Sequence, residues 1–68
     1  MSAETLIRMA NQIAANLAAQ GEAVAIAETA QHIRDFWDPR MKAGILAADH
    51  AALSPIARAA VAQLVPAG

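Results

Sequence analysis

The sequence predicts an all-α fold, a small bundle of three to four short helices without strands. Alanine, the strongest helix former, occupies 20 of the 68 positions, whereas the chain contains only three Gly and three Pro residues. Apolar residues recur at helical spacing, and no run of Val, Ile or Thr shows the period of two that is typical of a strand. We therefore expect one domain, residues 1–68, with helices near 3–20, 22–37, 39–50 and 55–65.

The first two helices are predicted from an apolar stripe in each and from the glycine between them. Gly21 stands where a residue with a left-handed backbone usually closes a helix. The first stripe spans about 100° of arc, the width of a helix face that packs against a core. The stripes are Leu6, Met9, Ala10, Ile13 and Leu17 in the first helix, and Ile26, Ala30, Ile33 and Trp37 in the second.

The third and fourth helices are predicted from the dipeptides Asp38-Pro39 and Ser54-Pro55. In each, the first side chain can accept a hydrogen bond from an N–H group that the first helical turn leaves unpaired, and proline has no such group. We expect the third helix to fray near Asp49. The stripes are Met41, Ile45, Ala48 and Ala52, followed by Ile56, Ala60 and Leu64.

The core that these stripes can form is thin. Apart from alanine, only 19 hydrophobic side chains are available, and a chain this short buries only about 60% of the surface that its unfolded form exposes. Because the sequence has no Cys, disulfides and thiolate metal sites cannot compensate. We therefore expect the isolated chain to be marginally stable or to self-associate, and to be stabilised by a partner subunit.

Charge and hydropathy exclude several classes of protein. The formal net charge is −1 and Lys and Arg are not clustered, so a regulator that binds nucleic acid would lack its basic face. The longest uncharged stretch, Met9–Gly21, has 13 residues and includes four amide side chains, whereas a membrane-spanning helix needs about 20 mainly apolar residues. The N-terminus lacks the pattern of a secretory signal. We expect a cytoplasmic protein without a nucleic-acid or membrane partner.

The sequence offers no recognisable catalytic or metal-binding set. Glu28 and His32 are four residues apart, a spacing that favours a helix-surface ion pair or hydrogen bond over a metal site. The side chains of Asp49 and His50 point about 100° apart on a helix and do not form an acid–base dyad. No glycine-rich phosphate loop is present. We predict no catalytic residue, no cofactor and no metal in this chain, which is then not an independent enzyme.

The segment from His32 to Met41 contains both aromatic residues of the chain. Phe36 and Trp37 are adjacent, hence about 100° apart on a helix, and Trp37 shares the stripe of the second helix. Since a bundle this small can hardly bury both rings, we expect one ring inside and the other at a second surface. In the alternative, both rings wrap around a loosely packed core. An exposed ring would suit a partner-binding site, because aromatic residues, Met and Arg are enriched at interface centres.

Charged residues surround the aromatic pair. Asp38 is predicted to be the N-cap of the third helix. Arg40 either pairs locally with Asp35 or Asp38, or presents its planar guanidinium to a carboxylate of a neighbour. We predict that the docking surface is formed or bordered by Phe36, Trp37, Asp38, Arg40 and Met41.

Three amide side chains interrupt the alanine-rich first helix, at Asn11, Gln12 and Asn16. A solvated helix face explains them. The alternative is that they form hydrogen bonds across an interface.

Three stretches of the sequence together resemble a known family. They are Arg8-Met9-Ala10-Asn11-Gln12-Ile13-Ala14, then His32-Ile33-Arg34 followed by Phe36-Trp37-Asp38-Pro39-Arg40-Met41, and Leu53-Ser54-Pro55 before an alanine-rich helix. The sequence is similar at these positions to the delta subunit of soluble NAD-dependent formate dehydrogenase, and the resemblance covers nearly the whole chain. Residues 47–53 are short and plain for that family.

The resemblance implies a small accessory subunit of a cytoplasmic complex that contains molybdenum or tungsten. In that complex a large subunit oxidises formate at a bis-pterin metal centre, and electrons pass through iron–sulfur clusters to a flavin that reduces NAD+. The resemblance places none of these cofactors on the delta subunit. It implies a non-catalytic subunit that docks on the larger subunits and stabilises the complex. The alternative is an assembly factor that acts during metal-cofactor insertion into the large subunit.

Overall fold

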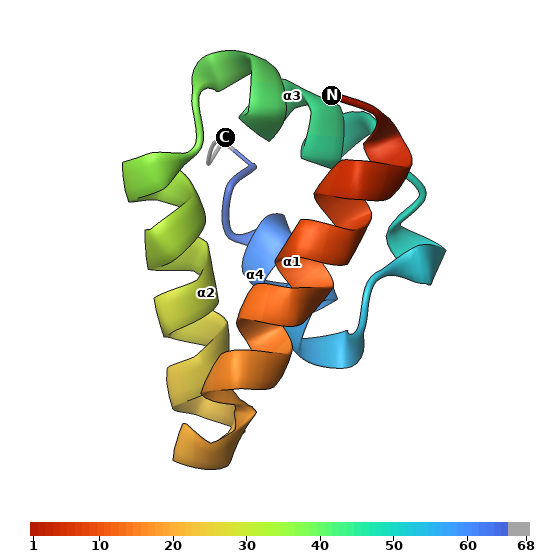
Figure 1. Ribbon diagram of the computed structural model, residues 1–68. Helices are drawn as coiled ribbons and strands as arrows, with labels where there is room; N and C mark the ends of the chain where they lie inside the picture. Colours follow the sequence, from red (N-terminus) through yellow and green to blue (C-terminus); the bar gives the residue numbers. More distant parts are fainter. Residues whose placement is uncertain (66–68) are drawn as a thin grey trace.

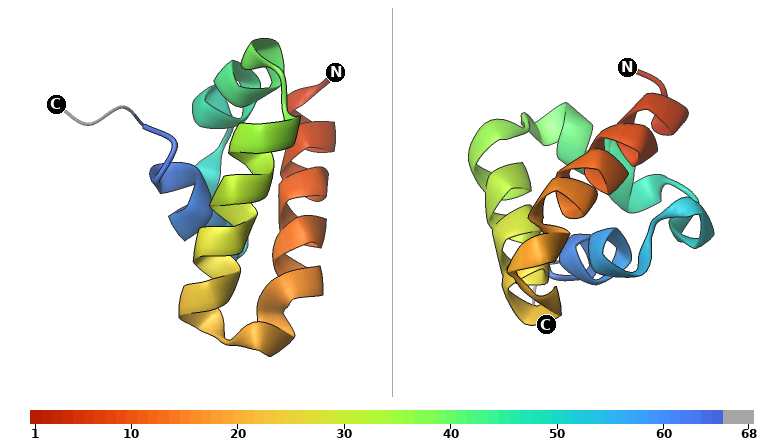
Figure 2. Two further views of the ribbon diagram at one scale, coloured as in Figure 1. Left: turned by 90° about the vertical axis from the view of Figure 1, so that its left-hand side faces the viewer. Right: turned by 60° about the horizontal axis from the view of Figure 1, so that its bottom comes forward.

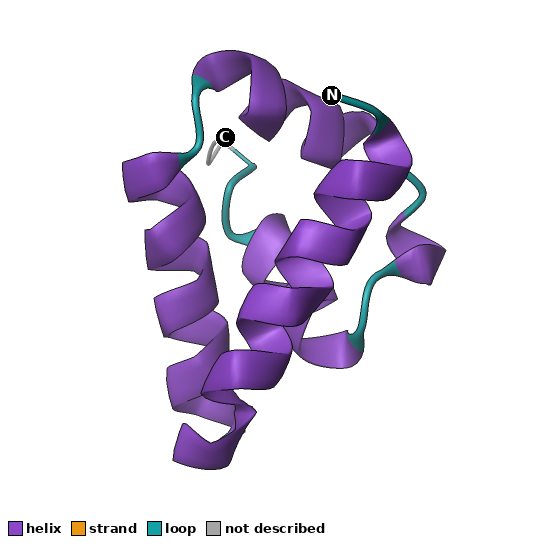
Figure 3. Cartoon of the chain, viewed as in Figure 1, coloured by secondary structure: helices purple, strands orange, loops and turns teal. Residues whose placement is uncertain are grey.

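The computed structural model describes residues 1–65, which form helices joined by short turns (Figure 1). The α-helices are α1 (Ala3–Leu17), α2 (Glu22–Phe36), α3 (Pro39–Ala47) and α4 (Pro55–Ala62), and the short 3₁₀-helices are η1 (Ala18–Gln20) and η2 (His50–Ala52). No strand occurs in this part of the chain (Figure 3). The predicted all-α fold class is confirmed.

The first two helices, α1 and α2, form an antiparallel hairpin and lie side by side (Figures 1 and 2). They meet at Gly21, whose φ of 99° is readily adopted only by glycine. Its ψ is 149°, so Gly21 adopts a positive-φ conformation nearly restricted to glycine rather than the left-handed helical conformation that we expected. The N–H group of Gly21 donates to the carbonyl of Ala18 at 3.1 Å, which closes η1.

Side-chain caps begin three of the four α-helices. Ser2, Asp38 and Ser54 each accept a hydrogen bond from the backbone N–H three residues further on, at 3.2, 2.8 and 3.3 Å. Asp38 and Ser54 are each followed by proline in the first turn, so both predicted caps are confirmed. A cap of this kind stabilises a helix by about 1 kcal/mol.

The helices end earlier than their predicted ranges. The first passes into a 3₁₀ turn after Leu17, the second ends at Phe36 and the fourth at Ala62. The longest helices have 15 residues. Within residues 1–65, none combines the length and the hydropathy that crossing a bilayer requires.

The largest difference from the prediction concerns α3, which ends at Ala47 rather than near residue 50. The Nε2 atom of His50 lies 3.2 and 3.1 Å from the carbonyl oxygens of Ile45 and Leu46. The ring thus adds to the capping of this helix end, where the N–H of Ala48 also donates to the carbonyl of Ile45 at 3.3 Å, and the chain does not continue into a further helical turn. Consequently Ala52 belongs to η2 rather than to the apolar stripe of α3, and that part of the prediction is wrong.

The core lies where the four α-helices meet. Six of its twelve buried hydrophobic residues are alanines, which let helices approach closely but contribute little apolar area. The approach of α3 to α1 is close as well, because a Cβ atom on Gly44 would lie 2.6 Å from Cδ1 of Leu6. The larger buried side chains are Leu6, Ile33, Trp37, Ile45, Leu53 and Val61.

Candidate docking surface

The junction between α2 and α3 carries the five residues predicted to form a docking surface. The N–H of Trp37 still donates to the carbonyl of Ile33 at 3.0 Å, but Trp37 and Asp38 have extended backbones with ψ of 136° and 168°. For Asp38 the reason is steric, because the ring of a following proline disfavours the helical conformation. The junction lies at the end of the α1–α2 hairpin that is opposite its turn (Figure 1).

The two aromatic rings at this junction occupy different environments. Trp37 is 5% exposed and belongs to the core cluster, whereas Phe36 is 74% exposed. The expectation that one ring lies inside and the other at the surface is therefore confirmed. Because Trp37 is buried, Phe36 is the ring of this pair that a partner can reach.

The exposed ring of Phe36 lies against the imidazole of His32. The ring centroids are 4.9 Å apart and the planes are inclined at 40°. The two residues are one helical turn apart on α2, so they share a face. In the described part of the chain, His32 thus contacts Phe36 rather than Glu28, the partner that we expected.

Asp38 and Met41 both contribute to the fold at this junction. Asp38 is exposed, but its Oδ1 accepts the hydrogen bond from the N–H of Met41 that caps α3. Met41 is half-buried and packs against the core cluster. Both of these predicted docking residues therefore have a structural role, Asp38 as the cap of α3 and Met41 in packing against the core cluster.

Most cationic side chains bind main-chain carbonyls rather than carboxylates. Lys42 donates to the carbonyl of Arg34 at 2.9 Å, near the end of α2, and Arg34 donates to the carbonyl of Gln63 at 2.9 Å, at the end of α4. Arg58 donates to two carbonyls at η2, at 3.2 and 3.3 Å. The contacts of Lys42 and Arg34 partner carbonyls near the C-terminal ends of α2 and α4, where the helix dipole also favours a positive charge. The contacts of Arg58 instead tie η2 to α4.

Arg40 is different, because it is exposed and makes no hydrogen bond or ion pair within residues 1–65. Neither local partner that we considered is used: Asp35 accepts instead from Gln31, at 2.9 and 3.0 Å, and Asp38 caps α3. Arg40 borders a hollow of about 340 Å³ between the start of α1 and the start of α3. The hollow is lined by Met1, Leu6, Asp38, Arg40, Met41 and Gly44.

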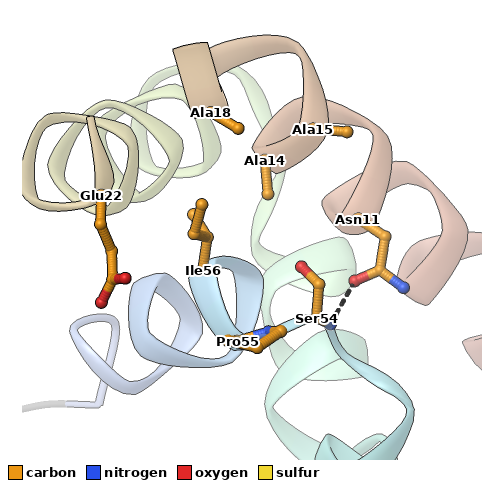
Figure 4. A pocket seen from close by; sticks show the side chains of 8 residues that line it. All are labelled: Asn11, Ala14, Ala15, Ala18, Glu22, Ser54, Pro55 and Ile56. Carbon is orange, nitrogen blue, oxygen red and sulfur yellow. Dashed lines mark hydrogen bonds between the residues drawn. The ribbon is translucent and has the colours of Figure 1, made fainter. Parts of the chain in front are cut away.

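A second hollow, of about 380 Å³, lies between the C-terminal half of α1 and the start of α4. Figure 4 shows Ile56 pointing from α4 toward the alanines of α1. Glu22 supplies the carboxylate in the lining of this second hollow. It lies in the first turn of α2, where the helix dipole favours an acidic residue. The charge of Glu22 therefore has an explanation within the fold.

Asn11, at the edge of this second hollow, ties α1 to the segment before α4. Its Oδ1 accepts from the N–H of Ser54 at 2.8 Å, drawn as a dashed line in Figure 4, and its Nδ2 donates to the carbonyl of Ala52 at 3.1 Å. Gln12 and Asn16 bind each other at 3.0 Å on the exposed face. We expected Asn11 either on a solvated helix face or at an interface with a partner, and neither expectation included this internal role. The sequence feature that could have indicated it is the position of Asn11 next to the buried stripe of α1.

Neither histidine lies in a setting that indicates catalysis. His32 contacts the ring of Phe36, His50 contacts the end of α3, and neither lines one of the two hollows. Residues 1–65 contain no group of three or more His, Asp or Glu side chains placed to hold a metal ion. The arrangement at the α2–α3 junction offers binding groups: an exposed ring, a guanidinium and an adjoining hollow.

Comparison with known proteins identifies the family of the chain. The family model described as NADH-dependent formate dehydrogenase delta subunit, FdsD, matches residues 5–61. No curated protein and no solved structure matches the chain. The matched range begins in α1, includes the whole α2–α3 junction and ends in α4. The resemblance seen in the sequence is thus confirmed, and the chain belongs to the family of NADH-dependent formate dehydrogenase delta subunits.

Proposed function

We propose that this chain is a non-catalytic accessory subunit that docks on the larger subunits of a cytoplasmic, molybdenum- or tungsten-containing formate dehydrogenase and stabilises the complex. Membership of the delta subunit family supports association with the other subunits. The thin core supports dependence on a partner, because six larger buried side chains are few for a free-standing domain.

The exposure of Phe36 is the observation that carries this proposal. A ring that is 74% exposed keeps most of its apolar area in water, and covering it by a partner removes that unfavourable contact. A Phe side chain buries roughly 150–250 Å² when covered, at about 25 cal/mol per Å² of apolar area. Phe36 is then the apolar anchor of the contact, with Arg40 and Met41 beside it in the sequence.

The proposal assigns no catalytic, metal-binding or cofactor-binding residue to this chain. Its histidines contact an aromatic ring and helix carbonyls, and three of its cations contact the main chain. The redox chemistry then belongs to the larger subunits. Nucleic acid and membranes are not among the proposed partners.

Purification of the active complex through a tag on this chain tests the proposal. A permanent subunit stays bound at a fixed stoichiometry in moderate salt, together with larger subunits that mass spectrometry identifies. An assembly factor, the alternative, is substoichiometric in the active complex and enriched on complex that lacks the metal cofactor. If no larger subunit is retained by the tagged chain, both functions are wrong.

A further inference from the structure

Arg40 occupies a position where its charge is unfavourable to the isolated fold. It is the second residue of α3, after the Asp38 cap and Pro39. The positive end of a helix dipole lies at the N-terminus, where acidic side chains are favoured and cations are not. The first turn of α3 contains no acidic residue, and no carboxylate of residues 1–65 pairs with Arg40. The Asp38 carboxylate caps the helix, but it is not paired with Arg40. Violations of a local preference are expected at functional sites.

Arg8 provides an internal comparison for Arg40. In the described part of the chain, these two are the arginines whose side chains make no hydrogen bond or ion pair, and both are exposed. Arg8, however, lies inside α1 rather than in its first turn, and it lines neither of the two hollows. The combination of an unfavourable position with an adjoining hollow is therefore specific to Arg40.

The hollow beside Arg40 combines an apolar wall with this charge. Met1 and Met41 supply accessible apolar surface beside the buried side chain of Leu6, and Gly44 lets α3 lie close to that side chain. Asp38 also lines the hollow, and its Oδ1 accepts the hydrogen bond from the N–H of Met41 that caps α3. The hollow has a volume of about 340 Å³, whereas one water molecule occupies about 30 Å³ in liquid water. The hollow can therefore accommodate a large side chain.

We propose that this hollow receives an acidic segment of a larger formate dehydrogenase subunit. A carboxylate of that segment binds the guanidinium of Arg40, and a neighbouring apolar side chain fills the space over Leu6 and Met41. The inference rests on the proposed function and is supported by charge complementarity. The guanidinium of Arg40 has no partner within residues 1–65, and its planar fork matches a carboxylate through two parallel hydrogen bonds. An apolar side chain in the hollow excludes water and thereby strengthens the ion pair.

The rate at which this chain dissociates from the intact complex tests the inference. The complex is captured through a tag on a larger subunit, and the loss of this chain is followed during washing. We expect Arg40→Gln to raise the dissociation rate about tenfold and Arg40→Lys to raise it less, because lysine keeps the charge but not the fork. Arg8→Gln, the matched control, should stay within about twofold of the wild type, as is usual for charges outside an interface.

A charge reversal separates docking from a role in the fold. Arg40→Glu should raise the melting temperature of the free chain by about 2–4 °C, because it places an acidic residue in the first turn of α3. The same substitution should accelerate dissociation more than Arg40→Gln does. Wild-type dissociation rates for Arg40→Gln and Arg40→Glu, or a lowered melting temperature of Arg40→Glu, would overturn the inference while leaving the proposed function intact. If the wild-type chain is not retained by the complex at all, the proposed function itself fails.

Discussion

Phe36 and Trp37 are consecutive in the chain, yet Phe36 is 74% exposed and Trp37 is 5% exposed. The two environments arise because α2 ends between them: Phe36 is its last residue, and Trp37 already has an extended backbone. The core and the proposed docking surface can therefore be perturbed separately by two neighbouring single substitutions.

Trp37→Ala and Phe36→Ala should have opposite consequences. Trp37→Ala opens a cavity in the core and should destabilise the free chain by about 3–5 kcal/mol, enough to unfold it. Phe36→Ala should leave the helical content of the free chain unchanged but weaken association with the larger subunits by about 30-fold or more. Circular dichroism and co-purification check the two effects. Equal losses of helical content in both variants would contradict this division of roles.

His50→Ala should affect stability without affecting formate turnover. The substitution removes the ring that partners the carbonyls of Ile45 and Leu46, and should lower stability by about 1 kcal/mol. His32→Ala serves as the control, because His32 is exposed and contacts the surface ring of Phe36. Turnover per intact complex should match the wild type in both variants. A large loss of turnover in fully assembled complex would show that a histidine takes part in catalysis.

Asn11→Ala should destabilise the chain far more than Asn16→Ala, although both change an Asn of α1. Asn11 holds the segment before α4 through two hydrogen bonds, and their loss should cost about 1–2 kcal/mol. Asn16 bonds only to Gln12 on the exposed face, so its removal should stay within about 0.5 kcal/mol. Urea denaturation of the two variants provides the measurement, and equal midpoints would rule out the anchoring role of Asn11.

Thr29→Val should stabilise the chain. Thr29 is 0% exposed, and within the described residues its Oγ1 has no hydrogen-bond partner. Valine keeps the shape and removes the unsatisfied hydroxyl, so the stability should rise by about 1 kcal/mol. Thr5→Val is the control, because the hydroxyl of Thr5 lies 2.9 Å from Oγ of Ser2 and its loss should bring no gain. A lower melting temperature for Thr29→Val would mean that the buried hydroxyl is satisfied.

The isolated wild-type chain should melt at a low temperature, over a broad range, or self-associate. Six larger buried side chains, with the half-buried residues packed against them, must offset the ordering of backbone and side chains, for which the entropy cost is about 1.5 kcal/mol per residue. Thermal scans at several protein concentrations check this expectation. A sharp transition above about 80 °C that does not depend on concentration would show that the core is more stable than its composition indicates.

Local sequence features were sufficient for several parts of this structure. The starts of α3 and α4 were predictable because an Asp-Pro or Ser-Pro dipeptide acts through its own side chain and the next turn of backbone. Helical periodicity placed Trp37 in the stripe of Ile33 and Phe36 about 100° away, and together with the small core this predicted that one ring would be buried and the other exposed. The family was recognisable from the same segments.

Contacts that neither periodicity nor a capping dipeptide encodes decided the rest. The ring of His50 folds back onto carbonyls only four and five residues before it, whereas Asn11 bonds to residues 41 and 43 positions away in the sequence. The isolation of Arg40 likewise emerged only when Asp35 and Asp38 were seen to bind other groups. Periodicity and capping act within one or two helical turns, so they determine where helices begin and which face is buried. Which amide anchors a loop, and which cation is left without a partner, depends on how the helices are brought together in space.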